Sequence, residues 1–359
     1  MMKKRVFVAM SGGVDSSVAA ALLQKKGFQV IGITMCFNLA EFKGSKPSCC
    51  GLTGIEDARK VARLLGIKHY LLNLQKVFQK EVINDFRGQY LAGLTPNPCI
   101  RCNQFIKFGV LFKKIRLLGG DFLATGHYAR IVKTKRGYFL KKARDLRKDQ
   151  SYFLYRLGAD QLKHSLFPLG NYLKEDVRLL AGQLGLPVAS KPDSQEICFL
   201  PENNYREFLK SSDKKSIKPG LIVDCQGNIL GTHQGTPFYT IGQRQGLGIA
   251  SKHPLYVTSI RQETNQIIVG SKEDAFSKEC LLHQLHFVGR PFKKKVEIKV
   301  KIRYNHKEAK ADLYPVKGKL KVIFHKPQFA ITAGQSAVFY SQSIVLGGGV
   351  IERQRKLND

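Results

Sequence analysis

The chain has no tryptophan and few acidic side chains. Its 359 residues include 27 Asp and Glu against 59 Lys and Arg, which gives a formal net charge of +32 at pH 7. This excess is larger than solubility requires and favours a polyanionic partner, chiefly nucleic acid. A generally basic proteome would produce a similar excess. Residues 290–326 concentrate it, with 13 Lys and Arg, 3 acidic residues and interleaved aromatic rings, as expected of a nucleic-acid-binding face.

Long apolar runs are also absent. No stretch of the sequence approaches the ~20 apolar residues of a membrane-spanning helix, so we expect no membrane partner. The basic segment Met1–Arg5 is followed by a short apolar run that leads into a glycine loop. This pattern predicts a first strand rather than a signal peptide. The protein is therefore expected to be cytoplasmic.

The glycine loop at Met10–Ser17 reads MSGGVDSS and is the most informative motif in the chain. It follows the apolar run Arg5–Ala9 and precedes the helix-like segment Val18–Leu23, which predicts a strand, a tight turn and a helix start. Gly12 and Gly13 let backbone N–H groups approach an anion, and the helix N-terminus favours a phosphate or pyrophosphate there. No lysine follows the glycines, so this is not a Walker loop. It resembles the pyrophosphate loop of ATP-pyrophosphatases; a purely structural turn is the alternative.

Strand-like and helix-like segments alternate in the N-terminal half of the chain. The expected strands cover residues 5–9, 30–35, 69–74 and 121–127, and further helices are expected at 53–65, 76–91 and 104–118. The alternation predicts an α/β fold with a doubly wound parallel sheet that binds ligands at the carboxyl ends of its strands.

The C-terminal part has a different pattern. A polar segment at 211–216 is typical of a linker, and short β-rich runs follow at 222–230, 246–249 and 267–270. Alternating apolar and polar residues over 296–303 predict half-buried strands of a small barrel. We therefore expect a catalytic domain at 1–209, a central β-rich domain at 210–277 and a C-terminal β-barrel at 278–359.

The cysteines do not indicate a disulfide framework in a large cytoplasmic protein. Cys36, Cys225 and Cys280 have no partner motif and are interpreted as structural. Cys99 and Cys102 form a C-x-x-C motif just before an expected helix, and a thiol there is expected to have a pKa below the free value of ~8.5. The pair is then a nucleophile or a soft metal ligand, although one C-x-x-C indicates zinc only weakly. Two unreactive turn cysteines are the alternative.

Seven motifs occur in order along nearly the whole chain: AMSGGVDSS, TPNPCIRCN, ATGHYAR, KDQSYFLY, KPDSQEICFL, YTIGQRQGLGI and TAGQSAVFY. Together they resemble the tRNA-specific 2-thiouridylase family. The resemblance implies a sulfurtransferase that uses ATP to adenylate the C2 oxygen of the wobble uridine in tRNA. Sulfur then replaces that oxygen, giving 2-thiouridine, AMP and pyrophosphate.

The resemblance also implies roles for individual residues. Cys198 would receive a persulfide from a sulfur donor, either a cysteine desulfurase or a sulfur-relay protein. Cys102 would be the nucleophile that helps to release this sulfur, leaving a Cys102–Cys198 disulfide. ATP, with Mg²⁺, would contact Ala9, Met10, Ser11, Gly12, Gly13, Val14, Asp15, Ser16, Met35 and Gly126. The target base and the tRNA would contact Asn97, Pro98, Cys99, His127, Lys148, Asp149, Gln150, Arg303, Tyr304 and Gln335; no residue is expected to be a dedicated metal ligand.

Three of these residues have simpler structural interpretations. Met35 could belong to the core, Arg303 could be a solvated strand charge, and Gln335 could cap its glycine-containing turn. The sequence leaves both interpretations open.

Two positions depart from the family pattern. Many members have Asp where this chain has Cys99, and the change creates a set of three thiols with Cys102 and Cys198. Three thiolates can hold a [4Fe–4S] cluster with one open iron, so delivery of sulfur from a cluster is an alternative to the persulfide. The second departure, Ala333 in place of a frequent Pro, changes the stiffness of its turn.

Two other functions compete with this interpretation. Other ATP-pyrophosphatases share the loop but do not predict Cys102, Cys198 and the YTIGQRQGLGI segment together. A basic RNA-binding protein with an inactive nucleotide pocket would have no need for the intact loop with Asp15 and both serines. The sequence does not indicate which tRNAs are modified or which oligomer forms.

Overall fold

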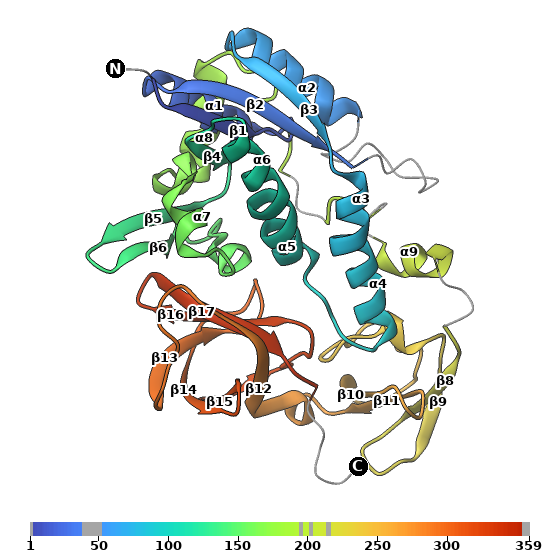
Figure 1. Ribbon diagram of the computed structural model, residues 1–359. Helices are drawn as coiled ribbons and strands as arrows, with labels where there is room; N and C mark the ends of the chain where they lie inside the picture. Colours follow the sequence, from blue (N-terminus) through green and yellow to red (C-terminus); the bar gives the residue numbers. More distant parts are fainter. Residues whose placement is uncertain (1–2, 38–51, 194–196, 201–203, 213–216, 354–359) are drawn as a thin grey trace. The chain divides into compact units, whose positions relative to one another are not determined.

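The computed structural model describes residues 3–37, 52–193, 197–200, 204–212 and 217–353 (Figure 1). The chain divides into two compact units. Unit 1 comprises Met1–Ile83, Pro98–Asn204 and Ser343–Leu346, and unit 2 comprises Asn84–Asn97, Tyr205–Gln342 and Gly347–Asp359. The chain therefore passes between the two units several times.

Unit 1 is built on a five-stranded parallel sheet with the strand order β3-β2-β1-β4-β7. The strands are β1 (Arg5–Ala9), β2 (Gln29–Cys36), β3 (Lys68–Asn73), β4 (Phe122–Thr125) and β7 (Ser165–Leu166). In the register, Ala9 of β1 lies opposite Ile33 of β2 and Thr125 of β4. The predicted parallel α/β sheet is thus confirmed, and the segments that follow β1 and β4 emerge at the same edge.

Helices flank this sheet (Figure 1). The helical segments of unit 1 are α1 (Val14–Lys25), α2 (Leu52–Leu64), α3 (Gln75–Phe78), α5 (Pro98–Arg101), α6 (Phe112–Leu117), α7 (Ala159–Lys163), α8 (Lys174–Gln183), the 3₁₀ turns η3 (Ser151–Leu154) and η4 (Pro168–Asn171), and the π-helical segments η1 (Gln79–Ile83) and η2 (Cys102–Leu111). Val6 and Val8 of β1 are fully buried, as are Val18 and Ala19 of α1. Burial of each large aliphatic side chain contributes ~1.5–3 kcal/mol, and the small alanine lets the helix approach the sheet closely.

The helix that carries the C-x-x-C motif begins earlier than the sequence predicted. We expected it to start at Gln104, but Pro98–Arg101 is already helical and continues directly into η2. Proline is favoured in the first turn of a helix because it has no N–H to leave unsatisfied. Cys99 and Cys102 therefore lie within the first turns of this helix and not before it.

A hairpin of unit 1 was not predicted. It consists of β5 (Ala129–Thr134) and β6 (Gly137–Lys142), and the segment Ser343–Leu346 pairs with β6. The N–H of Lys142 donates to the backbone oxygen of Ser343 at 2.8 Å. The pairing joins residues two hundred positions apart, which no local sequence pattern reports.

Unit 2 contains a four-stranded sheet and a closed six-stranded barrel. The sheet, in the order β10-β11-β8-β9, consists of β8 (Gly220–Val223), β9 (Ile229–His233), β10 (Tyr256–Arg261) and β11 (Gln266–Gly270). The barrel consists of β12 (Phe276–Phe287), β13 (Val296–Lys301), β14 (Ala309–Val316), β15 (Lys319–Phe329), β16 (Ser336–Ser341) and β17 (Ile344–Ile351), and pairing of β12 with β17 closes it. Helices α4 (Asn84–Leu91) and α9 (Tyr205–Ser212) and the turns η6 (Thr236–Phe238) and η7 (Glu273–Ala275) complete the unit. The predicted β-rich region and barrel are confirmed.

One predicted strand is wrong. Residues 246–249 form no strand and belong to a loop. Gly246 and Gly248 have φ angles of +73° and +69°, which are incompatible with the extended conformation of a strand. The predicted linker at 211–216 falls largely outside the described residues.

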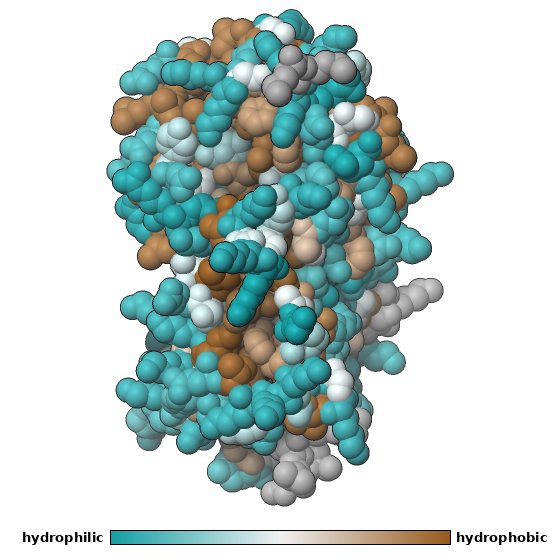
Figure 2. Space-filling view, turned by 60° about the vertical axis from the view of Figure 1, so that its left-hand side comes forward, coloured by the Kyte–Doolittle hydropathy of each residue, from teal (hydrophilic) through white to brown (hydrophobic). Residues whose placement is uncertain are grey.

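Hydrophilic side chains dominate the face drawn in Figure 2, in keeping with the many lysines and arginines of the chain. Among the residues that the structure describes, no helix is long and apolar enough to cross a membrane.

Candidate active site

The glycine loop connects β1 to α1 at the carboxyl edge of the parallel sheet. Gly12 has a φ of +72°, and a Cβ at this position would collide with the backbone oxygen of Gly54 in α2. Only glycine satisfies both conditions. Gly126, directly after β4, is equally confined, because a Cβ there would lie 2.7 Å from backbone atoms of Asp15 and Ser16. The structure thus places Gly126 against the first turn of α1.

The serine side chains of the loop are used internally. Ser16 and Ser17 are buried, and the Oγ of each donates to the backbone oxygen of Gly13, at 3.2 and 2.9 Å. The Oγ of Ser16 also accepts from the N–H of Ser11 at 3.2 Å. These bonds close the loop onto the start of α1. A phosphate at this loop would therefore meet backbone N–H groups and the positive end of the α1 dipole.

The remaining predicted ATP contacts lie at the same sheet edge. Met10 is buried, and its N–H donates to the backbone oxygen of Ile33 at 2.8 Å. Met35 lies two residues further along β2 and is half-buried. Ala9 ends β1. Contact of these residues with a nucleotide stays a prediction.

Asp15 is the charged residue of the loop, with 34% of its side chain exposed. Its Oδ1 accepts hydrogen bonds from the Tyr128 hydroxyl at 2.8 Å and from Lys174 Nζ at 2.7 Å. Burial and the adjacent Asp15 carboxylate raise the pKa of Tyr128 far above its ordinary value. The phenol therefore stays protonated and acts as a donor to Asp15.

Lys174 also contacts Asp193, whose Oδ1 lies 2.9 Å from the Lys174 ammonium. Lys148 and Arg178 approach the same carboxylate at 2.9 and 2.5 Å. Burial alone would raise the pKa of Asp193, but hydrogen bonds from Lys148 and Lys174 lower it to about 2. We refer to Asp15, Lys148, Lys174, Arg178 and Asp193 as the Lys174 cluster. It combines three cations with two carboxylates and so has a positive charge to offer an anionic ligand.

A second lysine holds the loop from another direction. Lys191 Nζ donates to the backbone oxygen of Gly12 at 3.0 Å and to Asp57 of α2 at 2.8 Å. Sequence analysis identified none of Lys174, Lys191 and Asp193 as site residues. Lys191 and Asp193 lie within the motif KPDSQEICFL, so attention to its charged residues would have found them. Lys174 lies outside every motif and gave no signal.

The two predicted catalytic cysteines come from different segments of unit 1. Cys102 is half-buried and Cys99 is exposed. Between them, Arg101 Nε donates to the backbone oxygen of Glu81 at 3.0 Å, and the guanidinium lies 3.6 Å from the Glu81 carboxylate. The C-x-x-C helix is thereby fixed to η1.

Cys198 is half-buried and precedes Phe199, which is buried. The ring of Phe199 packs edge-on against Phe78 of α3, with centroids 5.8 Å apart. Because α3 continues directly into η1, both cysteine segments contact one continuous helix, Gln75–Ile83. The structure therefore places the Cys102 and Cys198 segments in the same neighbourhood of unit 1.

The cysteines interpreted as structural occupy other places. Cys280 in β12 is buried, and burial raises the pKa of its thiol to about 12. Burial also raises the pKa of Cys36 in β2. Cys225 is exposed, with its Sγ 3.7 Å from the backbone oxygen of Val269. The raised pKa values make Cys280 and Cys36 poor nucleophiles.

Several predicted tRNA contacts of unit 1 are engaged within the protein. Asp149 is buried and accepts from the N–H of Ala143 at 2.9 Å and the hydroxyl of Ser151 at 2.7 Å. Gln150 accepts from the N–H of Tyr128 at 3.0 Å. His127 is buried, its ring lies 2.6 Å from Thr125 Oγ1, and burial lowers its pKa well below 6.5. A neutral, buried imidazole is suited to positioning the turn after β4 more than to pairing with a phosphate.

The predicted tRNA contacts of unit 2 lie in the barrel. The Arg303 guanidinium lies 5.9 Å from the centre of the Phe329 ring, and the Lys301 ammonium lies 5.3 Å from that of Tyr304. The side chain of Gln335 donates to the backbone oxygens of Thr95 at 2.9 Å and Pro96 at 3.3 Å. Gln335 therefore does more than cap its own turn, because it holds the segment that leads to Asn97.

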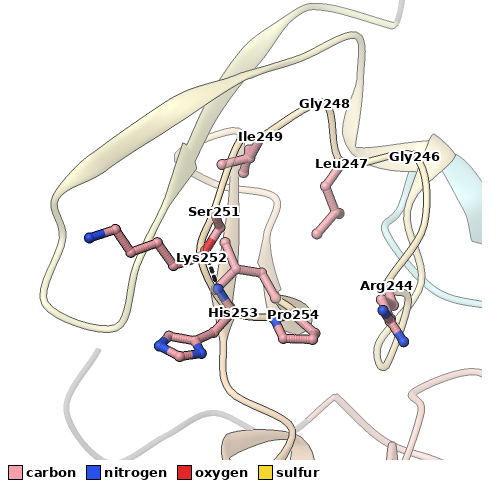
Figure 3. Close-up of a pocket in the computed structure, with 10 residues that line it drawn as sticks. Arg244, Gly246, Leu247, Gly248, Ile249, Ser251, Lys252, His253 and Pro254 are labelled. Atoms are coloured by element: carbon pink, nitrogen blue, oxygen red, sulfur yellow. Dashed lines mark hydrogen bonds between the residues drawn. The ribbon is translucent and has the colours of Figure 1, made fainter.

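Unit 2 also contains a separate cavity of about 440 Å³ (Figure 3). The loop 244–255 lines it, with Arg244 and His253 on opposite sides and Leu247 between them. The Oγ of Ser251 accepts from the N–H of His253 at 3.4 Å. This loop contains the QGLG residues of one of the seven motifs, although sequence analysis predicted no cavity there.

Comparison with known proteins gives matches over most of the chain. The family described as the tRNA methyl transferase HUP domain matches residues 4–202, its PRC-barrel domain matches 206–271, and the aminomethyltransferase β-barrel domain matches 277–351. The tRNA-specific 2-thiouridylase MnmA of Acetivibrio thermocellus is 50% identical over 98% of this chain and 100% of its own length. MnmA 1 of Caldanaerobacter subterraneus is also 50% identical, over 98% of this chain and 99% of its own. The chain belongs to the tRNA-specific 2-thiouridylase family.

More distant relatives in the family are similar over the same length. MnmA of Clostridium acetobutylicum is 47% identical over 98% of this chain and 100% of its own. Among solved structures, NMN synthetase from Francisella tularensis overlaps 60% of this chain and 79% of its own, with 18% identity and a TM-score of 0.35. This last likeness is too slight to bear on function. Membership of the family agrees with the resemblance that the seven motifs carry.

Proposed function

We propose that this protein converts the wobble uridine of tRNA to 2-thiouridine at the expense of ATP. The observation that carries the proposal is that unit 1 holds the glycine loop together with the Cys102 and Cys198 segments, which both contact the helix Gln75–Ile83. ATP activates the C2 oxygen of the base by adenylation, since an unactivated carbonyl oxygen is a poor leaving group. A sulfur nucleophile then displaces AMP.

ATP is a substrate of this reaction, and its phosphates fit the loop on physical grounds. The confined glycines Gly12 and Gly126 fix the loop against α2 and the turn after β4 against the start of α1, and a helix N-terminus held in this way favours an anion. Lys174 and Lys191, which contact Asp15 and the backbone oxygen of Gly12, supply positive charge at the same loop. Among the described residues, both contacts of Asp15 fall on Oδ1. We propose that Oδ2 of Asp15 receives Mg²⁺ that accompanies ATP.

The sulfur step requires both cysteines. A donor protein transfers a sulfane sulfur to Cys198, and the terminal sulfur of this persulfide ends bonded to C2 of the base. Its release breaks the persulfide bond as the Cys102 thiolate bonds to the Cys198 sulfur, while AMP leaves with the former C2 oxygen. The two cysteines lose two electrons in this step. A thiol reductant must reduce the resulting Cys102–Cys198 disulfide before the next cycle.

The alternative sulfur source, a [4Fe–4S] cluster on Cys99, Cys102 and Cys198, rests on the presence of Cys99. Cys99 is exposed, whereas Cys102 and Cys198 are half-buried. A cluster on this set would keep one iron open for sulfide. Purification without oxygen followed by iron analysis tests it: absence of iron and of a broad visible absorption band would exclude the cluster.

tRNA is the proposed nucleic-acid partner, and the proposed sulfur donor is a cysteine desulfurase or a sulfur-relay protein. We propose that Lys148, Arg303 and Tyr304 contact tRNA and that Asn97, Pro98 and Cys99 contact the target base. His127, Asp149, Gln150 and Gln335, whose side chains are engaged within the protein, position those contacts. A cytoplasmic location, where tRNA and reduced thiols are available, accompanies this function.

A reconstituted assay tests the function. Protein, ATP, Mg²⁺, a cysteine desulfurase with cysteine, and unmodified glutamate tRNA are combined, and the digested nucleosides are analysed by mass spectrometry. A sulfur-for-oxygen mass increase on the wobble uridine that requires ATP and Cys198 is the expected result. Release of pyrophosphate without the mass increase would mean that sulfur delivery is missing. Absence of both would favour the RNA-binding alternative.

A further inference from the structure

The Lys174 cluster joins two segments that have different tasks in the proposed reaction. Asp15 belongs to the ATP loop, and Asp193 lies five positions before Cys198. Lys174 is 7% exposed, and its ammonium contacts Asp15 Oδ1 at 2.7 Å and Asp193 Oδ1 at 2.9 Å. One buried cation is therefore shared between the ATP loop and Asp193.

The position of Lys174 is fixed by its surroundings. It is the first residue of α8, its N–H donates to Asp145 at 3.2 Å, and its ammonium lies 5.7 Å from the centre of the Tyr128 ring. Tyr128 donates to the same oxygen of Asp15 that Lys174 contacts. These contacts hold the Lys174 ammonium between the carboxylates of Asp15 and Asp193.

Removal of this cation would leave two carboxylates facing each other. Like charges in a partly buried site repel, and each would keep only part of its partners. Asp193 would retain Lys148 and Arg178, whereas Asp15 would retain the neutral hydroxyl of Tyr128. Removal of the Lys174 charge would therefore destabilise Asp15 and the ATP loop more than it destabilises Asp193.

We propose that Lys174 is a positioning residue that couples occupancy of the ATP loop to the placement of Asp193, five positions before Cys198 in the chain. The cysteine segment has a second anchor on its other side, where Phe199 packs on Phe78. With the loop occupied, the triphosphate adds negative charge beside Lys174 and holds its ammonium at the junction. The Asp193 anchor then stays in place, and we expect the reactivity of the Cys198 thiol to report whether it does.

This inference rests on the proposed function only for the use of ATP and of Cys198, and its test needs no tRNA. The probe is the α,β-methylene analogue of ATP, which cannot be cleaved between the α and β phosphates. Two quantities are measured in the full-length protein: the Kd of the analogue, and the rate at which iodoacetamide alkylates Cys198, followed by peptide mass spectrometry. Five variants are compared: Lys174→Met, Lys174→Arg, Asp193→Asn, the double variant Lys174→Met with Asp193→Asn, and the control Arg147→Met.

The control removes a nearby cation that contacts neither Asp15 nor Asp193; it shares with Lys174 only the carboxylate of Asp145, which accepts from the Lys174 backbone N–H. Arg147 pairs with Asp145 and Glu175, and 69% of its side chain is exposed. Arg147→Met is expected to leave both quantities within twofold of the wild type. A large effect of this variant would mean that general electrostatics, and not the shared lysine, sets affinity for the analogue.

The expected results follow from the coupling. Lys174→Met weakens analogue binding about tenfold, and Asp193→Asn, which does not touch the loop, weakens it roughly fivefold in the wild-type background. In the Lys174→Met background, Asp193→Asn has little further effect. The analogue slows alkylation of Cys198 in the wild type and not in Lys174→Met. Lys174→Arg, which keeps the charge, restores part of this protection.

Contrary results would overturn the inference. If Asp193→Asn leaves the Kd of the analogue unchanged, or if its effect is the same with and without Lys174, the two segments are not coupled through this lysine. Asp193→Asn decides this even if Lys174→Met does not fold. A wild-type protein that does not bind the analogue at all would overturn the proposed function as well. If the wild-type protein binds the analogue but the effects of Lys174→Met and Asp193→Asn on its Kd are additive, only the coupling is overturned.

Discussion

The side-chain amide of Gln335 donates to the backbone oxygen of Thr95 at 2.9 Å, linking the turn before β16 to the segment that leads to the predicted base-binding loop. The contact is reinforced from the other side, because the N–H of Thr95 donates to the backbone oxygen of Ala333 at 2.9 Å. A Cβ on Gly334 would lie 2.9 Å from the Thr95 nitrogen. The TAGQ turn thus fits closely around Thr95 and sets the path of the chain into Asn97.

This geometry predicts that Gln335 acts through the base-binding loop. Gln335→Ala is expected to lower the turnover of tRNA thiolation about two- to twelvefold, the equivalent of the ~0.5–1.5 kcal/mol that one hydrogen bond contributes, with the Kd for tRNA little changed. Gln328→Ala, which removes a half-buried glutamine of β15 whose side chain donates to the backbone oxygen of Lys326, serves as the control. A loss confined to tRNA affinity would instead show that Gln335 binds tRNA directly.

The sulfur chemistry predicts separate effects on the two half-reactions. Cys198→Ser is expected to abolish formation of 2-thiouridine while ATP-dependent adenylation, measured as tRNA-dependent pyrophosphate release, stays near the wild-type level. The hydroxyl cannot hold a persulfide. Cys225→Ser, at an exposed cysteine outside the motifs, should retain full activity. Thiolation by Cys198→Ser would disprove the assigned role.

The confined backbone at Gly12 predicts a loss of ATP binding on addition of a single methyl group. In Gly12→Ala the residue must leave its φ of +72° or displace Gly54, and either change distorts the anion-binding loop. We expect the Kd for the ATP analogue to rise at least tenfold. Gly27→Ala is a matched control, because Gly27 has a similar φ of +83° with no atom within 4 Å of its Cβ position. It should cost stability, ~1–2 kcal/mol, and leave ATP binding unchanged.

The low pKa of Asp193 predicts how acid affects stability. Its pKa falls from 3.8 to about 2 on folding, so its contribution is fully present above pH ~4 and is lost as the pH falls towards ~2. The contribution is at most about 2 kcal/mol. The difference in unfolding free energy between wild type and Asp193→Asn should therefore shrink between pH 4 and 2. A difference that stays constant over this range would show that Asp193 titrates normally.

A pair of lysines on the barrel predicts where removal of positive charge weakens tRNA binding most. Lys299 of β13 and Lys310 of β14 lie directly opposite each other, and both are exposed. Among the described residues neither has an acidic partner, and such a pair is unfavourable until a polyanion neutralises it. The double variant Lys299→Gln with Lys310→Gln should weaken tRNA binding. The slope of the logarithm of the binding constant against the logarithm of the salt concentration should become shallower by about one to two, because fewer counterions are released.

Lys295 provides the comparison for this pair. Its ammonium lies 3.0 Å from Asp312, so its charge is already compensated within the barrel. Lys295→Gln is expected to change tRNA affinity and the salt slope less than the Lys299 and Lys310 changes do. Equal effects would indicate that net charge alone governs binding.

The sequence predicted most reliably those features that neighbouring residues determine. The strand–glycine–helix pattern predicted the loop correctly, because a tight turn at Gly12 is encoded by neighbouring residues. Lys174 could not be predicted, since its partners Asp15 and Asp193 are far away in the chain and meet only through the packing of α8 on α1. The strand expected at 246–249 failed because two glycines with positive φ override its apolar pattern. Asp149 and His127 were assigned from a motif, and motifs do not report burial.

The short segment Ser343–Leu346, which pairs with the hairpin of β5 and β6, has a consequence for how the protein is made. Unit 1 combines residues up to 204 with this segment at 343–346, so the ribosome must synthesise the chain beyond residue 346 before the unit can complete its hydrogen bonds. A nascent or truncated chain would expose the edge of β6, an open strand on which a second chain could pair. Expression of the catalytic region as a fragment that ends before residue 343 should therefore yield a product prone to aggregation.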